Sequence, residues 1–87
     1  GPIVDDPVAK VDEYLEHRAL REEQVLGCIH DGQDTVPAMV AVIYAAYPDG
    51  VHGIAALTMQ GHLDKLIAEG RVAVDASGDE NRYRVIG

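Results

Sequence analysis

The stretch from Tyr14 to Leu26 constrains the fold most, because it has helical periodicity yet places ions where apolar side chains belong. At 100° per residue, one apolar stripe forms, made of Val11, Tyr14, Leu15, Val25, Leu26 and Ile29. Arg18 and Glu22 fall near the centre of that stripe. Buried charges are tolerated only when they are paired and hydrogen-bonded. The pattern therefore predicts a helix over about residues 8–29 that holds both ions in a fixed polar contact.

A second helix is predicted from the N-cap Thr35 to about Tyr47, with Pro37 in its first turn and Pro48 beyond its end. Its side chains are apolar on nearly every side, which is typical of a helix covered on both faces. The predicted core stripe of this helix consists of Val36, Met39, Val40, Ile43 and Tyr47, and its far side of Ala38, Ala41, Val42 and Ala45.

A third helix is predicted over about residues 52–69, and Gly70 suits the position after its C-terminus. Strands over 71–75 and 82–86, joined by the loop 76–81, then predict a β-hairpin. The core stripe expected for the third helix consists of Ala55, Ala56, Met59, Leu63, Leu66 and Ile67.

Three helices followed by a hairpin give a fold class that is mainly α with a small β-hairpin, a three-helix winged helix-turn-helix. A two-stranded hairpin is not stable alone, so the wing must pack on the helices. A chain of 87 residues is long enough for one domain with a modest core. We expect residues 1–7 to form an extended lead-in and residues 8–87 to form a single winged-helix domain.

DNA binding is disfavoured by the charge of the chain. The formal net charge is −8, whereas affinity for nucleic acids comes largely from Lys and Arg that neutralise phosphates. A DNA-recognition helix should carry Arg, Lys, Asn or Gln on its outward face. The outward face of the third helix is instead small, apolar and nearly neutral. We single out as a possible contact face Ile54, Leu57, Thr58, Gly61 and Lys65. RNA or DNA binding through Arg71, Arg82 and Arg84 at the base of the wing is kept as a rival hypothesis.

Residues suited to catalysis are sparse. The four histidines, His17, His30, His52 and His62, are not spaced as zinc ligands on one helix, and there is no HExxH run. We expect His62, at the edge of the third helix's core stripe, to be a hydrogen-bonded structural residue. The single cysteine, Cys28, is expected to be a small buried hydrophobe. No catalytic residue, metal ligand or cofactor is therefore predicted in this chain, which we do not expect to be an enzyme by itself.

Sequence features relevant to location are few. No apolar run approaches 18 residues, no signal peptide is visible, and the negative charge disfavours anionic membranes. One cysteine provides no disulfide framework, which fits a reducing compartment. These features predict a cytoplasmic protein with no membrane partner.

Two runs carry a family resemblance: YLEHRALREEQVL at residues 14–26 and HLDKLIAEGRV at residues 62–72, with Thr35–Val36, Tyr44 and His52 between them. Together they resemble the winged-helix domain that follows the catalytic domain in many metallo-β-lactamase-fold hydrolases, such as glyoxalase-II-like and endoribonuclease-like proteins. The resemblance covers nearly the whole chain. It implies an upstream hydrolase domain in the same polypeptide that binds zinc through residues absent here. Gly1-Pro2 resembles the end of the family's Gly-His-Gly-Pro metal-ligand turn, unless it is a cloning scar.

The resemblance and the charged stripe suggest one role, an accessory domain that packs on the hydrolase domain and shapes its substrate cleft. The expected domain-interface group, at or just behind the cleft, consists of Tyr14, His17, Arg18, Arg21 and Glu22. Alternatively, Arg18 and Glu22 pair only within the domain and orient the first helix. A rival of another class is a stand-alone acidic winged helix that acts as a protein-interaction or transcription-related module.

Overall fold

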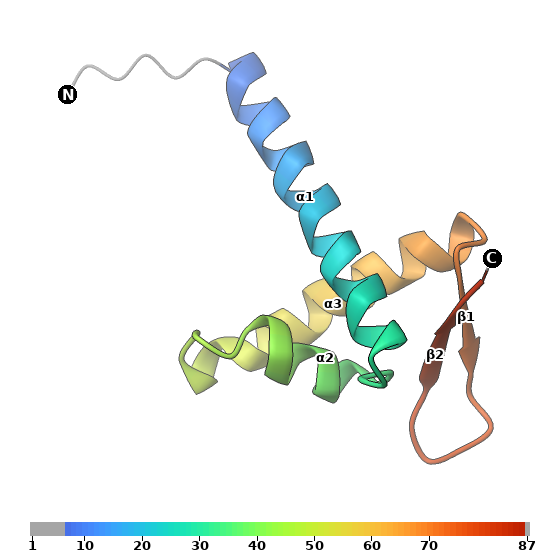
Figure 1. The fold of residues 1–87 in the computed structure, drawn as a ribbon. Coiled ribbons are helices and arrows are strands. Elements are labelled where there is room, and N and C mark those ends of the chain that lie inside the picture. The colour runs from blue at the N-terminus through green and yellow to red at the C-terminus, as the bar shows by residue number, and fades with distance from the viewer. Residues whose placement is uncertain (1–6, 87) are drawn as a thin grey trace.

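The computed structural model describes the backbone of residues 7–86 and the side chains of residues 17–86. The elements follow the predicted order: α1 (Pro7–His30), α2 (Val36–Ile43), the 3-10 turn η1 (Asp49–Val51), α3 (His52–Ala68), β1 (Val72–Asp75) and β2 (Arg82–Val85). Figure 1 shows α1 packed over α3, α2 beside them, and the hairpin at the C-terminal end of α3. The architecture is therefore the predicted winged helix. The predicted lead-in falls mostly on residues 1–6, outside the described residues.

Both long helices end as their glycines require. At the end of α3, Gly70 has φ +73°, its N–H donates to the Ile67 carbonyl at 3.0 Å, and the Arg71 N–H donates to the Leu66 carbonyl at 2.9 Å. Gly32, at φ +96°, closes α1 with the same pair of bonds. These are Schellman motifs, which favour glycine because a side chain is strained in the left-handed region. They set the direction in which the chain leaves each helix.

The second helix is shorter than predicted. Thr35 is its N-cap, as expected, and accepts a hydrogen bond from the Ala38 N–H at 3.3 Å. The helix ends at Ile43 rather than near Tyr47, and residues 44–47 form turns between the helix and Pro48. Tyr44 therefore takes the core position expected for Tyr47: it is 8% exposed, whereas Tyr47 is 48% exposed.

Only one side of α2 is covered within the domain. Its predicted inner residues Met39 and Val40 are buried. Ala41, Val42 and Ala45, on the predicted far side, are exposed, so the expectation of cover on both faces is wrong for this domain alone.

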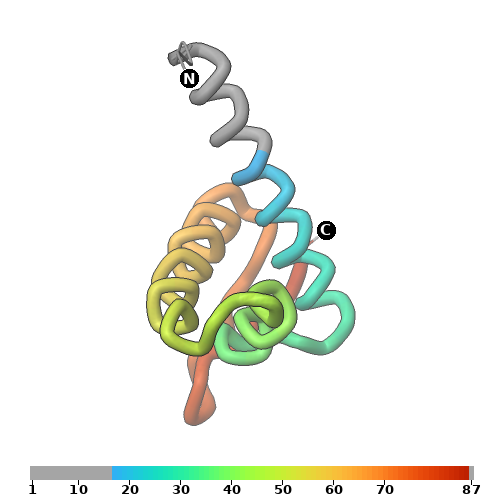
Figure 2. Tube along the Cα trace, turned by 90° about the vertical axis from the view of Figure 1, so that its left-hand side faces the viewer, coloured from blue at the N-terminus to red at the C-terminus, as the bar shows by residue number. Residues whose placement is uncertain are grey.

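One apolar core joins the three helices and the wing, and Figure 2 shows α1 and α3 side by side with the hairpin behind them and its loop projecting below. The two strands pair antiparallel with Val72 opposite Val85 and Val74 opposite Tyr83. Tyr83 is 3% exposed, and its N–H donates to the Asp34 carbonyl at 2.9 Å, which ties the wing to the loop before α2. The buried apolar residues are Val25, Cys28, Ile29, Met39, Val40, Tyr44, Ala55, Met59, Leu63, Leu66, Val72 and Tyr83.

Candidate functional site

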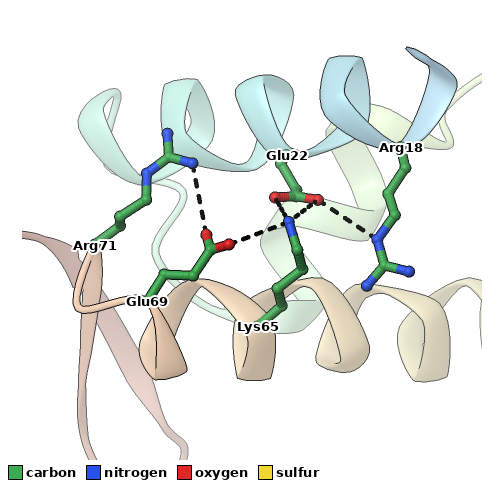
Figure 3. Close-up of polar contacts among 5 residues, drawn as sticks. All are labelled: Arg18, Glu22, Lys65, Glu69 and Arg71. Atoms are coloured by element: carbon green, nitrogen blue, oxygen red, sulfur yellow. Dashed lines mark hydrogen bonds and ion pairs between the residues drawn. The ribbon is translucent and has the colours of Figure 1, made fainter. Parts of the chain in front are cut away.

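A ladder of alternating charges connects α1 to α3 and the start of the wing. Lys65 donates from Nζ to both carboxylate oxygens of Glu22, at 2.7 and 3.0 Å, and Arg18 Nε lies 3.6 Å from Glu22 Oε2. Beyond them, Lys65 pairs with Glu69 at 3.4 Å, and Glu69 pairs with Arg71 at 3.7 Å. Figure 3 shows these five side chains in the space between the two helices. We call Arg18, Glu22, Lys65, Glu69 and Arg71 the ion ladder.

Glu22 is the most buried member of the ion ladder, at 5% exposed. Burial of its carboxyl raises the pKa of Glu22, but the Lys65 hydrogen bond and the charges of Lys65, His62 and Arg18 outweigh it, so the pKa lies below its ordinary value. The same contact raises the pKa of Lys65. The charge pair predicted on the apolar stripe is thus real, but its stronger partner is Lys65 rather than Arg18.

Two hollows flank Arg18. One, of about 500 Å³, lies along the ion ladder and is lined by Arg18, Ala19, Glu22, Glu23, Lys65 and Arg71. The other, of about 260 Å³, lies between α1, the end of α2 and α3, and is lined by His17, Arg18, Arg21, Tyr44, Thr58 and His62. We call the second hollow the arginine pocket. The structure therefore gathers four predicted interface residues, His17, Arg18, Arg21 and Glu22, around two adjoining hollows.

Arg21 forms one wall of the arginine pocket. Its guanidinium carbon lies 4.7 Å from the centroid of the Tyr44 ring, and Nη1 donates to Gln24 Oε1 at 3.0 Å. A guanidinium over an aromatic face is attracted by the ring quadrupole. The early end of α2 builds this contact, since it places Tyr44 rather than Tyr47 beneath α1.

His62 differs from its prediction. It is buried, as expected, at 8% exposed, but its Nδ1 has no hydrogen-bond partner among the described residues. Burial lowers the pKa of His62, and the charges of Arg18, Arg21 and Lys65 lower it further, whereas Glu22 raises it. The imidazole is therefore held towards its neutral form at the edge of the arginine pocket. The sequence did not predict that this nitrogen lacks a hydrogen-bond partner, because nearby charged residues such as Arg18, Arg21 and Glu22 belong to α1.

The predicted outward face divides into two parts. Ile54 and Leu57 are 68% and 76% exposed, and Thr58 and Gly61 are exposed as well. A Cβ added at Gly61 would meet nothing within 4 Å, so packing within the domain does not demand a glycine there. Lys65 does not belong to this face, because its side chain turns to Glu22 in the ion ladder. The role of these residues in contacts with a partner stays a prediction, as does that of Tyr14, whose side chain lies outside the described residues.

Among residues 17–86 no three His, Cys, Asp or Glu side chains lie close enough together to hold a metal ion. Zinc does not fit these residues, and no chemical step through zinc follows from this chain. Cys28 is buried, and burial followed by the Asp31 charge raises the pKa of its thiol, which disfavours the nucleophilic thiolate. None of the helices in the described part of the chain is long and apolar enough to cross a membrane.

The arginines at the wing base are partly neutralised. Arg82 donates to Asp34 at 3.0 Å, and Arg71 belongs to the ion ladder. Arg84 is exposed on the outer side of β2. Basic residues already held by carboxylates bind phosphate less readily, which weakens the case for nucleic-acid binding at this edge.

The helix order, the packed hairpin and the α2–α3 pair define a winged-helix domain. A family model described as the "Beta-lactamase associated winged helix domain" matches residues 35–81. The chain is also 34% identical over 86 residues, 95% of its length, to the Drosophila melanogaster "Beta-lactamase-like protein 2 homolog". A Caenorhabditis elegans protein of the same description is 34% identical over 73 residues, 83% of the chain. The chain therefore belongs to the family of β-lactamase-associated winged-helix domains.

These relatives are much longer than the chain. It spans 30% of the Drosophila protein and 25% of the Caenorhabditis protein. The matched segment thus corresponds to one part of each relative, and the family description associates that part with a β-lactamase-like protein.

Proposed function

We propose that this domain is the non-catalytic accessory part of a cytoplasmic metallo-β-lactamase-fold zinc hydrolase, and that it packs on the hydrolase domain and shapes its substrate cleft. Residues upstream of this chain would bind the zinc. The observation that carries the proposal is the gathering of His17, Arg18 and Arg21 around the arginine pocket. Polar side chains that line a hollow, rather than a flat solvated surface, are suited to contact a partner or substrate.

The lengths of the relatives support this proposal. Since the chain covers less than a third of each relative, most of each lies outside the matched segment. The relatives' printed description is β-lactamase-like, which fits a hydrolase-type domain in that remainder.

The exposed side of α3 supports a protein contact as well. Ile54 and Leu57 project from this helix with most of their surface accessible. Burying large apolar side chains stabilises an association by about 1.5–3 kcal/mol each in the favourable case. Contact with the hydrolase domain would cover part of this surface.

The decisive experiment compares the hydrolase activity of the complete polypeptide with that of versions carrying Arg21→Ala or Arg84→Ala. Both changes remove one arginine, but only Arg21 lines the arginine pocket. We expect Arg21→Ala to raise KM or lower kcat by about tenfold, equivalent to about 1.4 kcal/mol, and Arg84→Ala to leave both nearly unchanged.

A second comparison removes the domain. If activity, KM and thermal stability of the hydrolase stay the same without it, the accessory role is wrong. A stable homodimer of the 87-residue chain that is lost on Leu57→Asp, together with unchanged hydrolase kinetics, would favour the stand-alone interaction module instead.

A further inference from the structure

The arginine pocket has the composition of an anion site in a chain that is otherwise acidic. Its described lining contains two guanidinium groups and two imidazoles but no carboxylate, although the chain has a formal net charge of −8. The ion ladder passes beside this hollow, but Glu22 faces the neighbouring 500 Å³ hollow instead. The described lining of the arginine pocket therefore places the unpaired guanidinium of Arg21 where no carboxylate lines the hollow.

Arg21 has spare hydrogen-bonding capacity there. A guanidinium carries five N–H donors, and one of them is donated to Gln24. Among residues 17–86 no carboxylate lies within 4 Å of its nitrogens. The Tyr44 ring supports one face of the guanidinium and leaves its edge to meet a ligand. This planar, preorganised fork suits bidentate recognition of carboxylate or phosphate oxygens.

His62 contributes a buried polar group to the wall of this pocket. The side chain is more than nine-tenths buried, lines the arginine pocket, and leaves Nδ1 without a hydrogen-bond partner. Buried polar atoms are nearly always satisfied in folded proteins. That nitrogen has almost no accessible surface, so an oxygen in the hollow reaches it only if the ring turns. Thr58, by contrast, lines the pocket with a hydroxyl that already donates to the Ile54 carbonyl at 3.2 Å.

We propose that the arginine pocket binds an oxyanion, the phosphate or carboxylate group of a ligand, through the guanidinium of Arg21, beside Arg18, which is already paired with Glu22. His17 at the rim adds a further donor. The hollow of about 260 Å³ accommodates such a group, since one water molecule in the liquid occupies about 30 Å³. The site lies entirely within this chain, so the proposal does not depend on a hydrolase domain.

The test is a titration of the 87-residue chain with inorganic phosphate and, separately, with sodium acetate at constant ionic strength, followed by amide and imidazole NMR resonances. Saturable shifts confined to residues around His17, Arg21, Tyr44 and His62 are expected. We expect Arg21→Ala to weaken binding by at least about tenfold, and Arg84→Ala, a matched loss of one exposed arginine, by less than about twofold. Tighter binding of phosphate identifies a phosphoryl ligand, and tighter binding of acetate identifies a carboxylate ligand.

Shifts that do not saturate, or that centre on Arg71, Arg82 and Arg84, overturn the proposal. Equal weakening by Arg21→Ala and Arg84→Ala overturns it too, because this pattern indicates general charge attraction. Circular dichroism shows whether Arg21→Ala folds. If it does not, the location of the NMR shifts in the unsubstituted chain still tests the proposal. Anion binding without any effect of Arg21→Ala on the hydrolase would leave this proposal standing and contradict the accessory role.

Discussion

The two faces of α3 differ in how far their side chains are buried and paired within the domain. On the inner face Met59, Leu63 and Leu66 are fully buried, and Lys65 is held by Glu22. On the outer face Ile54 and Leu57 remain largely exposed. The same helix therefore serves as the core of the domain on one side and as a free surface on the other. Changes on the inner face should cost stability, whereas changes on the outer face should alter only contacts with a partner.

The largest expected contrast is between Leu63→Ala and Leu57→Ala. Leu63 is fully buried and Leu57 is 76% exposed. Truncating a buried leucine leaves a cavity and typically costs about 2–5 kcal/mol, whereas a surface change stays within about 0.5 kcal/mol. Urea unfolding of the two variants measures the difference. Equal losses would show that the outer face is also packed in solution.

The next effect should come from Glu22→Gln, with Glu23→Gln as its exposed neighbour. Glu22→Gln leaves Lys65 and Arg18 without their anion. Loss of a buried partner costs about 3–5 kcal/mol, but both cations are more than a third exposed, so we expect about 1–3 kcal/mol. Chemical unfolding near neutral pH checks this value. A Glu22→Gln variant as stable as Glu23→Gln would mean that the ion ladder contributes nothing measurable.

A pH scan tests the burial of His62. The pKa of His62 is lowered from 6.5 in the folded chain, chiefly by burial, so the unfolded chain binds the proton more readily. The free energy of unfolding should therefore fall as pH drops below about 6.5 and level off below the folded pKa. His62→Gln should flatten this slope. An unchanged slope in His62→Gln would assign the proton uptake to another group.

Glu22 contributes in a window that begins lower, below about pH 4.5. Its folded pKa is depressed below 4.5, so its contribution is complete above that pH and is lost as pH falls through the folded value. The part of the scan between about pH 6.5 and pH 4.5 therefore reports on the histidine while Glu22 stays ionised.

The smallest effect is expected at the wing. Arg82→Ala removes the ion pair in which Arg82 Nη1 lies 3.0 Å from Asp34 Oδ1. The Arg82 side chain is, however, 61% exposed. Exposed ion pairs contribute about 0–1 kcal/mol, so thermal unfolding should shift little. Retention on single-stranded RNA at low salt, lost in Arg82→Ala and Arg84→Ala, would revive the nucleic-acid hypothesis. Absence of retention would remove it.

Much of the fold could be predicted because its signals are local. Thr35 caps α2, Gly70 ends α3, and the hairpin follows as expected. The miss at Tyr44 is of another kind: the helical stripe was continued to Tyr47, whereas α2 ends at Ile43 and buries Tyr44 instead.

The candidate site was only partly predictable. Arg18 and Glu22 were singled out because ions on an apolar stripe demand partners, whereas His17 and Arg21 joined them through the family resemblance. The sequence assigned Lys65 to the outer face, and only the tertiary structure shows that Lys65 binds Glu22 across 43 residues of chain. It predicted a satisfied His62, and the structure orphans its Nδ1.

Sequence by itself thus determined the helices, their caps and the need to neutralise the buried charges, since these depend on residues a few positions apart. Tertiary structure decided that Lys65 pairs with Glu22 and that Tyr44 supports Arg21. It also decided that a hollow opens between α1, the end of α2 and α3. The physical reason is that side-chain direction depends on how α1 and α3 cross and where α2 stops. Contacts between residues this far apart in the chain produce no periodic pattern in the sequence.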